Sequence, residues 1–360
     1  MLYGAYGYTG SLIAQEASKR GHNPVLAGRS AEKLVPLAEK LNFDYIILDL
    51  KDENSLIKHL KDFDLVFHSA GPYKHTSAPM VKACLKTGTH YVDITGEIPV
   101  FEENFKYDTP AKAAGIAIIS GVGFDVVPTD CLAKYVSEKI SDPTTLDLGI
   151  TAMSNPSPGT LKTMLEYYDI GQLVRRNGKL VRLEKVEVRK MQFSDIERAV
   201  RPVTWGDLST AYRTTGIPNI STYFPLPKKF PNLLGSLGIT PKEMFENEEA
   251  KKKVETWIEQ NIHGPDEKTR LRSKSQIWVH AFNERGEDSQ AWLETMEGYR
   301  FTAIAGIRSV EKVFELKPKG VLTPSLAFGT DFILEFPETK RIDAIEEYIP
   351  QKKSKVIAAQ

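Results

Sequence analysis

Three glycines near the start of the chain have the spacing of a phosphate-binding turn. They lie in Gly4-Ala5-Tyr6-Gly7-Tyr8-Thr9-Gly10, directly after the short apolar run Met1-Leu2-Tyr3, and a helix-forming stretch follows from Ser11. This order predicts a strand, a tight turn and a helix. Glycine suits the turn because a pyrophosphate must come close to the main chain. The free N–H groups and the positive dipole at the helix start would then hold the anion.

The residue after the second predicted strand indicates which coenzyme the turn would bind. That strand ends at Gly28 and is followed by Arg29 and Ser30, with Lys33 one helical turn later. An NAD site usually has Asp or Glu at this point, where it binds the ribose 2′-hydroxyl. A cation suits a 2′-phosphate instead. The sequence therefore predicts NADP, used as NADPH, as the coenzyme.

The first 130 residues alternate between predicted strands and helices. The strands are residues 1–3, 23–28, 44–50, 65–70, 90–94 and 116–120, and the third of them has the composition of a buried strand. The helices are residues 11–20, 31–41, 54–60, 78–86, 109–115 and 131–139. Strands joined by helical crossovers predict an α/β fold, a Rossmann doubly wound parallel sheet with helices on both faces.

Ligands of such a sheet bind at the carboxyl ends of its strands. The candidate coenzyme-binding residues lie at these ends, in the glycine turn and after the second, third and fourth strands. They are Gly4, Tyr6, Gly7, Tyr8, Thr9, Gly10, Arg29, Ser30, Lys33, Asp49, Ala70, Gly71 and Pro72.

The pattern changes near residue 141, where alternating apolar and polar residues begin. Half-buried strands are predicted at residues 146–150, 179–183, 275–281 and 290–296, and helices at 159–168, 251–260 and 301–314. These elements predict a second α+β domain with a mostly antiparallel sheet. We therefore expect an NADP-binding domain over residues 1–140 and a substrate and dimerisation domain over 141–319. Residues 320–350 are expected to return to the first domain.

Composition excludes several classes of function. The chain of 360 residues has 47 basic and 47 acidic residues, which gives no support for nucleic-acid binding. Cys84 and Cys131 are far apart and form no metal-binding or redox pair, so we expect buried thiols, no metal and a cytoplasmic location. The start has no signal-peptide pattern, and no run of 18 apolar residues predicts a membrane span.

Further motifs give the sequence a family resemblance. With Tyr6 in place of the usual Thr, the start resembles the G-A-T-G-F-T-G opening of the saccharopine dehydrogenase-like oxidoreductases. The branch that it most resembles includes the trans-acting enoyl reductases. The other matching segments are Ala27-Gly28-Arg29, Gly71-Pro72-Tyr73, residues 88–97, residues 123–130 and Gly320-Val321-Leu322-Thr323-Pro324. The middle of the chain, residues 150–315, matches only in outline.

The resemblance implies an NAD(P)-dependent oxidoreductase that transfers hydride to a C=C or C=N acceptor, which the sequence does not identify. Such a reaction also needs a proton source. Tyr73 and Asp125 follow glycines at two strand ends, and we hypothesise that one of them positions or protonates the substrate. Asp93 and Glu97 fit a site role and a helix-capping role equally well. Asp130 fits a carboxylate in the first turn of a helix.

Two other functions remain open. One is a short-chain-dehydrogenase-type reductase, because Tyr135 and Lys139 lie four residues apart on one face of a predicted helix. The large second domain does not fit that class. The other is a nucleotide-binding protein without turnover, since no residue in the sequence is certain to be catalytic.

The stretch 223–234 interleaves prolines with aromatic residues and lysines. It fits a lid over an apolar small-molecule substrate, a contact with a membrane surface, or a plain loop. An exposed sheet in the second domain could also pair with its copy in a homodimer.

Replacing Arg29 with Ala should remove most of the preference for NADPH over NADH. A hydrogen bond to a charged partner contributes roughly 1.5–3 kcal/mol, and about 1.4 kcal/mol is tenfold in affinity. Arg29 should therefore favour NADPH by roughly ten- to a hundredfold, while the substitution leaves NADH binding nearly unchanged. Titration calorimetry with both reduced coenzymes on both proteins measures this. Equal affinity of the unaltered protein for the two coenzymes would contradict the assignment.

Overall fold

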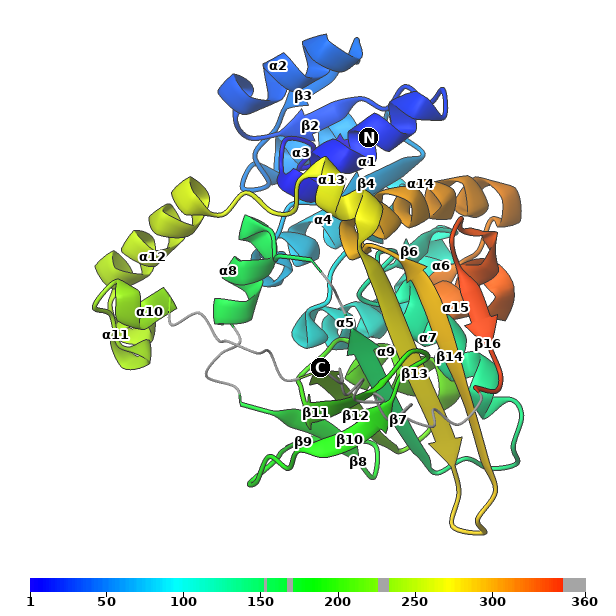
Figure 1. Ribbon diagram of the computed structural model, residues 1–360. Helices are drawn as coiled ribbons and strands as arrows, with labels where there is room; N and C mark the ends of the chain where they lie inside the picture. Colours follow the sequence, from blue (N-terminus) through cyan, green and yellow to red (C-terminus); the bar gives the residue numbers. More distant parts are fainter. Residues whose placement is uncertain (152–153, 167–170, 226–232, 346–360) are drawn as a thin grey trace, which may run out of the picture.

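The computed structural model describes residues 1–151, 154–166, 171–225 and 233–345, and it contains two sheets (Figure 1). The first sheet has seven parallel strands in the order β15-β6-β5-β4-β1-β2-β3. Its strands are β1 (Leu2–Tyr3), β2 (Leu26–Gly28), β3 (Tyr45–Ile47), β4 (Leu65–His68), β5 (His90–Asp93), β6 (Ala117–Ile119) and β15 (Gly320–Leu322). The predicted parallel sheet is confirmed. It gains a seventh strand because β15 arrives from far along the chain to pair with β6.

The helices that connect the first six strands cover both faces of this sheet. They are α1 (Tyr8–Lys19), α2 (Ala31–Leu41), α3 (Glu53–Leu60), α4 (Tyr73–Thr87), α5 (Ile98–Asn104), the 3₁₀ turn η1 (Phe105–Tyr107), α6 (Asp108–Ala114) and, after β6, α7 (Val127–Ser137). The prediction for α2 is correct at both ends. Helix α4 begins at Tyr73, earlier than predicted, and α5 was not predicted.

The prediction of a buried third strand is wrong. Tyr45 and Ile47 in β3 are 45% and 44% exposed. Among the described strands, β3 pairs with β2 alone and is the edge strand of the sheet, so no described strand covers its outer side.

The second sheet is mixed and mostly antiparallel, as expected. Its order is β10-β11-β12-β7-β13-β14-β16, with β8 and β9 beside β12, and only the β12–β7 pair is parallel among the described strands. The strands are β7 (Thr145–Thr151), β8 (Leu173–Arg176), β9 (Lys179–Arg182), β10 (Arg189–Gln192), β11 (Glu197–Pro202), β12 (Asn219–Pro225), β13 (Lys274–Phe282), β14 (Asp288–Met296) and β16 (Lys340–Ile342).

The remaining helices lie between β7 and β16 in the chain. They are α8 (Pro158–Glu166), α9 (Asp207–Thr215), α10 (Leu233–Ser236), α11 (Pro241–Glu246), α12 (Glu248–Asn261), α13 (Glu267–Arg272), α14 (Gly298–Leu316), α15 (Pro324–Phe328) and the 3₁₀ helix η3 (Thr330–Glu335). Helices α8 and α10–α12 form a helical arm that extends to one side of the sheets (Figure 1), with a small core of Ile239, Met244, Val254 and Ile258. Helix α9 packs on α7, and α14 packs on α1.

One apolar core joins the two sheets. The largest cluster of buried side chains contains Leu2 and Val92 from the first sheet together with Leu148 and Val279 from the second. Helix α7, which follows β6 of the first sheet, packs against β13 and β14 of the second sheet. The carboxyl edge of the first sheet is therefore held at a fixed place beside the second sheet.

The sequence also made predictions about residues 320–350, the stretch 223–234 and membrane spans. Of residues 320–350, β15 joins the first sheet and β16 joins the second, and the domain boundaries themselves stay a prediction. Within the stretch 223–234, residues 226–232 lie outside the described residues, so its role also stays a prediction. Across the described ranges, no helix has the length and apolar character needed to cross a membrane.

Replacing Gly10 with Ala should lower the free energy of unfolding by about 1–3 kcal/mol, the usual cost of an inserted methyl group in a packed site. A Cβ atom there would lie 2.3 Å from the carbonyl oxygen of Gly4, and the main chain at Gly4 has no room to retreat. Urea unfolding measures the change. Gly159→Ala is the matched control in the first turn of α8, where the nearest atom to the new Cβ is 3.8 Å away. Equal stability of the two variants would show that the turn can relax.

Candidate active site

The glycine turn follows β1 and packs against the end of β4, the central strand of the first sheet. Gly4 has a φ of +83°, and a Cβ there would lie 2.7 Å from the backbone nitrogen of Ala70. At Gly10 a Cβ would also lie 2.8 Å from the hydroxyl of Ser69. These two glycines allow the turn and the β4 end to touch, so the start of α1 is fixed at the carboxyl edge of the sheet.

The start of α1 fits an anion. Gly7 is its N-cap residue, no side chain caps the helix, and the first turn contains no acidic residue. The first-turn N–H groups are therefore free of any capping side chain and can bind a diphosphate. Tyr6 is accommodated because its ring packs on Gly28, where a Cβ would lie 2.5 Å from the ring.

The predicted residues for the adenosine end follow the neighbouring strands. Arg29 and Lys33 are exposed, and Ser30 is the N-cap residue of α2 but makes no capping hydrogen bond. Asp49, after β3, is exposed and accepts a 3.0 Å hydrogen bond from the backbone nitrogen of Lys51.

The helical arm faces this end of the sheet. Glu259 on α12 makes a 2.6 Å ion pair with Lys162 on α8. The pKa of Glu259 is lowered first by this contact with Lys162 and further by the charges of Lys33 and Arg29. Arg29 and Lys33 therefore lie within electrostatic reach of α12.

Residues 70–72 form the loop between β4 and α4. The carbonyl of Ala70 accepts a 2.7 Å hydrogen bond from Thr76, and the Gly71–Pro72 peptide bond is cis. The structure thus brings this loop, the glycine turn and Arg29 to the carboxyl ends of β4, β1 and β2, three adjacent strands. Whether these residues bind a coenzyme stays a prediction.

Glu97 is a capping residue. Its carboxylate accepts hydrogen bonds from the backbone nitrogens of Tyr73, at 2.7 Å, and Lys74, at 2.8 Å. This side chain explains why α4 begins at Tyr73, because it provides the acceptors that the first-turn N–H groups need. The Tyr73 ring is buried, and burial, with the nearby charges of Asp93, Glu97 and Asp125, raises the pKa of its hydroxyl well above the usual value.

Asp125 differs from the other acidic residues at the strand ends. Within the described ranges, no residue donates a hydrogen bond to its carboxylate, and burial raises its pKa to about 6. Gly96 lies beside it, since a Cβ on that glycine would be 3.1 Å from Asp125 Oδ2. Asp125 also contributes to the raised pKa of Tyr73, so the structure brings the two predicted catalytic side chains near each other. A carboxyl group with such a pKa can hold and release a proton near neutral pH.

Asp93 and Asp130 have structural contacts instead. Asp93 accepts hydrogen bonds from the backbone nitrogens of Thr95 and Gly121 and from the hydroxyls of Tyr91 and Ser120. Burial nevertheless raises its pKa to about 6.

Asp130, in the first turn of α7, accepts from the hydroxyl of Thr214 and from the backbone nitrogen of Ser325. It therefore ties α7 to α9 and α15.

The later part of the chain contributes residues that the sequence did not single out, Trp205 from the loop between β11 and α9 and Tyr299 from α14. The indole nitrogen of Trp205 donates a 3.1 Å hydrogen bond to the carbonyl of Asp125, and the Trp205 ring stacks on Phe224. The ring of Tyr299 meets that of Tyr8 edge to face, with centroids 5.0 Å apart. Local spacing gives no signal for these contacts, because Trp205 lies 80 residues after Asp125.

The Tyr135–Lys139 pair is engaged elsewhere. Both side chains bind Asp343, the tyrosine hydroxyl at 2.9 Å and the ammonium group at 2.7 Å. Tyr135 is eight residues after Val127, the first residue of α7, which places it about 12 Å along the helix from the helix start. Both side chains thus belong to an exposed cluster around Asp343, and Tyr135 does not lie at the strand ends as the tyrosine of a short-chain dehydrogenase site would.

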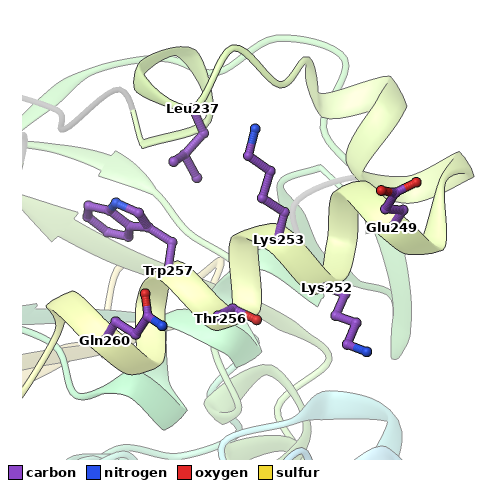
Figure 2. A pocket seen from close by; sticks show the side chains of 7 residues that line it. All are labelled: Leu237, Glu249, Lys252, Lys253, Thr256, Trp257 and Gln260. Carbon is purple, nitrogen blue, oxygen red and sulfur yellow. The ribbon is translucent and has the colours of Figure 1, made fainter.

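A hollow of about 410 Å³ lies on the helical arm, away from the strand ends (Figure 2). Its lining combines lysine side chains with one indole ring. The lining residues are Leu237, Glu249, Lys252, Lys253, Thr256, Trp257 and Gln260. It contains none of the predicted site residues, so it does not bear on the chemistry at the sheet.

Comparison with known proteins agrees with this geometry. Residues 1–119 match the family described as the saccharopine dehydrogenase NADP-binding domain. A saccharopine dehydrogenase-like oxidoreductase of Bos taurus is 31% identical over 178 residues, which are 43% of this chain and 41% of the relative. A trans-acting enoyl reductase of Mycobacterium ulcerans is 30% identical over 159 residues, 42% of this chain and 38% of the relative. The chain thus spans less than half the length of the curated relatives it matches.

Among solved structures, the fold resembles apo saccharopine dehydrogenase (L-Glu forming) from Saccharomyces cerevisiae. The match covers 95% of this chain and 99% of that one with a TM-score of 0.62. At 12% sequence identity it shows the fold alone.

Replacing Asp125 with Asn should increase the stability of the variant relative to the unaltered protein as the pH rises. A carboxyl whose pKa is raised from 3.8 to about 6 binds its proton more tightly in the folded state, so folding stability falls as pH rises from about 4 to about 6. Asparagine does not titrate. The free energy of unfolding of the variant, relative to that of the unaltered protein, should therefore rise by about 1–3 kcal/mol between pH 4 and pH 7. Urea unfolding at several pH values measures the gain. A difference that is constant with pH would contradict the raised pKa.

Proposed function

We propose that this protein, whose residues 1–119 match the saccharopine dehydrogenase NADP-binding domain, is an NADP-dependent oxidoreductase that transfers hydride to a C=C or C=N acceptor. The observation that carries the proposal is the Asp125 carboxylate. It has a raised pKa and no hydrogen-bond donor among the described residues, and it lies near Tyr73 at the same edge of the sheet as the glycine turn.

The coenzyme would lie along this edge. The first turn of α1 would hold the diphosphate, Arg29 with Ser30 and Lys33 the 2′-phosphate, and residues 70–72 would border the nicotinamide half. The bound coenzyme supplies the hydride. The residues fit this group because α1 has no capping side chain of its own and the glycine turn lets the ligand reach the main chain.

Asp125 supplies the proton that the reduction needs. Its carboxyl group holds a proton up to about pH 6 and faces no donor in the described chain that would hold it ionised. Tyr73 cannot serve as the acid in the same way, because its pKa lies well above the usual value. Its role is to orient the substrate through its hydroxyl, which is held 3.4 Å from the carbonyl of His68.

The surroundings favour an apolar substrate. On the side of the second sheet, the stacked rings of Trp205 and Phe224 adjoin Asp125, and Phe124 packs against Phe301 next to it. Apolar walls also contribute to the raised Asp125 pKa, since they reduce the contact of the carboxylate with water. The homodimer, the membrane-surface contact and the cytoplasmic location stay predictions.

Reduced coenzyme should lose its absorbance when the protein is given a suitable acceptor from a panel of imines, enoyl esters and ketones. With that acceptor, Asp125→Asn should lower kcat by about 10²–10⁴, the usual contribution of a general acid, with little change in coenzyme affinity. Tyr73→Phe should also lower kcat. Tyr135→Phe is the matched control and should retain full turnover, because its hydroxyl is bound to Asp343.

Full activity of both site variants would refute their roles. Tight NADPH binding without turnover across the panel would instead favour a nucleotide-binding protein that is not an enzyme.

A further inference from the structure

A segment between the helical arm and the second sheet lies on the start of α1. This segment, residues 262–272, includes α13 and is here named the strap. In Figure 1 it runs from α12 to the region of α1, where the arm ends and β13 begins. It reaches the site from a part of the chain that the glycine motif does not include.

Tyr8 fixes the strap in place. Its hydroxyl donates a 2.5 Å hydrogen bond to the carbonyl of Pro265. Gly264 has a φ of +71°, and a Cβ there would lie 2.8 Å from the Tyr8 ring. On its other side the ring meets Tyr299. Tyr8 is the first residue of α1, so the strap lies directly beside the N–H groups predicted to hold the diphosphate.

Arg270 brings a positive charge to this place. Its Nη1 donates to the hydroxyl of Tyr8 at 3.0 Å and to the carbonyl of Pro265 at 2.7 Å, both of them neutral acceptors. In the described part of the chain, no carboxylate lies within ion-pair distance of this guanidinium, and its Nε and Nη2 donate no hydrogen bond. The side chain is only partly buried.

We propose that the strap closes over the coenzyme diphosphate and that Arg270 is a coenzyme-binding residue which pairs with it. The inference rests on the proposed coenzyme binding and adds a residue from the second half of the chain. A guanidinium has five donors in a planar fork that matches two phosphate oxygens. One nitrogen, Nη1, holds the strap to Tyr8, and the remaining donors are free for the anion.

The 2′-phosphate and the diphosphate of the coenzyme would then be bound by different parts of the chain. Arg29 and Lys33, from the first sheet, serve the 2′-phosphate beside α12, whereas Arg270 serves the diphosphate. This division lets a probe without a diphosphate separate the two contributions. Adenosine 2′-monophosphate is such a probe, because it carries the 2′-phosphate alone.

The test compares Arg270→Gln, Arg270→Lys and Tyr8→Phe with the unaltered protein by titration calorimetry. Arg270→Gln should weaken NADPH binding by about ten- to a hundredfold, the range of a charge-assisted hydrogen bond, and leave adenosine 2′-monophosphate binding unchanged. Arg270→Lys should keep part of the affinity because it keeps the charge. Tyr8→Phe removes the anchoring hydroxyl but leaves the guanidinium, so its effect should be smaller than that of Arg270→Gln.

A second readout separates ion pairing from a purely structural role. The dependence of NADPH affinity on salt should be less steep for Arg270→Gln than for the unaltered protein, because one ion contact is missing. The inference is overturned if Arg270→Gln binds NADPH normally, or if it weakens both ligands equally, as a general loosening of the site would. If the unaltered protein binds neither ligand, the proposed function itself fails.

Discussion

The contact between the glycine turn and the end of β4 is the constraint on which the site depends. The main chain at Gly4 meets Ala70 with no space for a side chain, and Gly10 meets Gly4 and Ser69 in the same way. Because β1 pairs with both β2 and β4, this contact sets the position of three strand ends at once. The start of α1, the loop before α4 and Arg29 all take their places from it.

Buried carboxylates then hold the edge of the sheet together. Asp93 joins the ends of β5 and β6 through the backbone of Thr95 and Gly121, and Glu97 caps α4. Each of these groups has donors that satisfy its oxygens, as a buried carboxylate requires. Asp125, which is only partly buried, lies near them without such donors in the described chain. That contrast with Asp93 and Glu97 is what supports the proposed role of Asp125 as the proton donor.

Local patterns in the sequence were enough to predict the parallel sheet, the glycine turn and both ends of α2. They failed where a distant residue decides the outcome. Helix α4 starts at Tyr73 because of Glu97, which lies 24 residues later. The exposure of β3 depends on its place at the sheet edge, and strand order cannot be derived from the composition of one strand.

The same limit applies to the candidate site. The types of Tyr73 and Asp125 and their places after glycines were visible in the sequence. The walls around them were not, because Trp205 reaches the site from the loop between β11 and α9, and Tyr299 from helix α14. Tyr8 was visible as a neighbour of the glycines, but its contact with Pro265 spans 257 residues.

The late arrival of β15 has a consequence for biosynthesis. Its pairing partner β6 begins at Ala117, and the two meet in the register Gly320 to Ala117. At roughly 5–20 residues per second, a ribosome needs on the order of 10–40 s to make the chain between them. During that time β6 is an open edge strand, able to pair with other nascent chains. Synthesis of residue 322 is therefore the earliest point at which β15 can close this side of the first sheet.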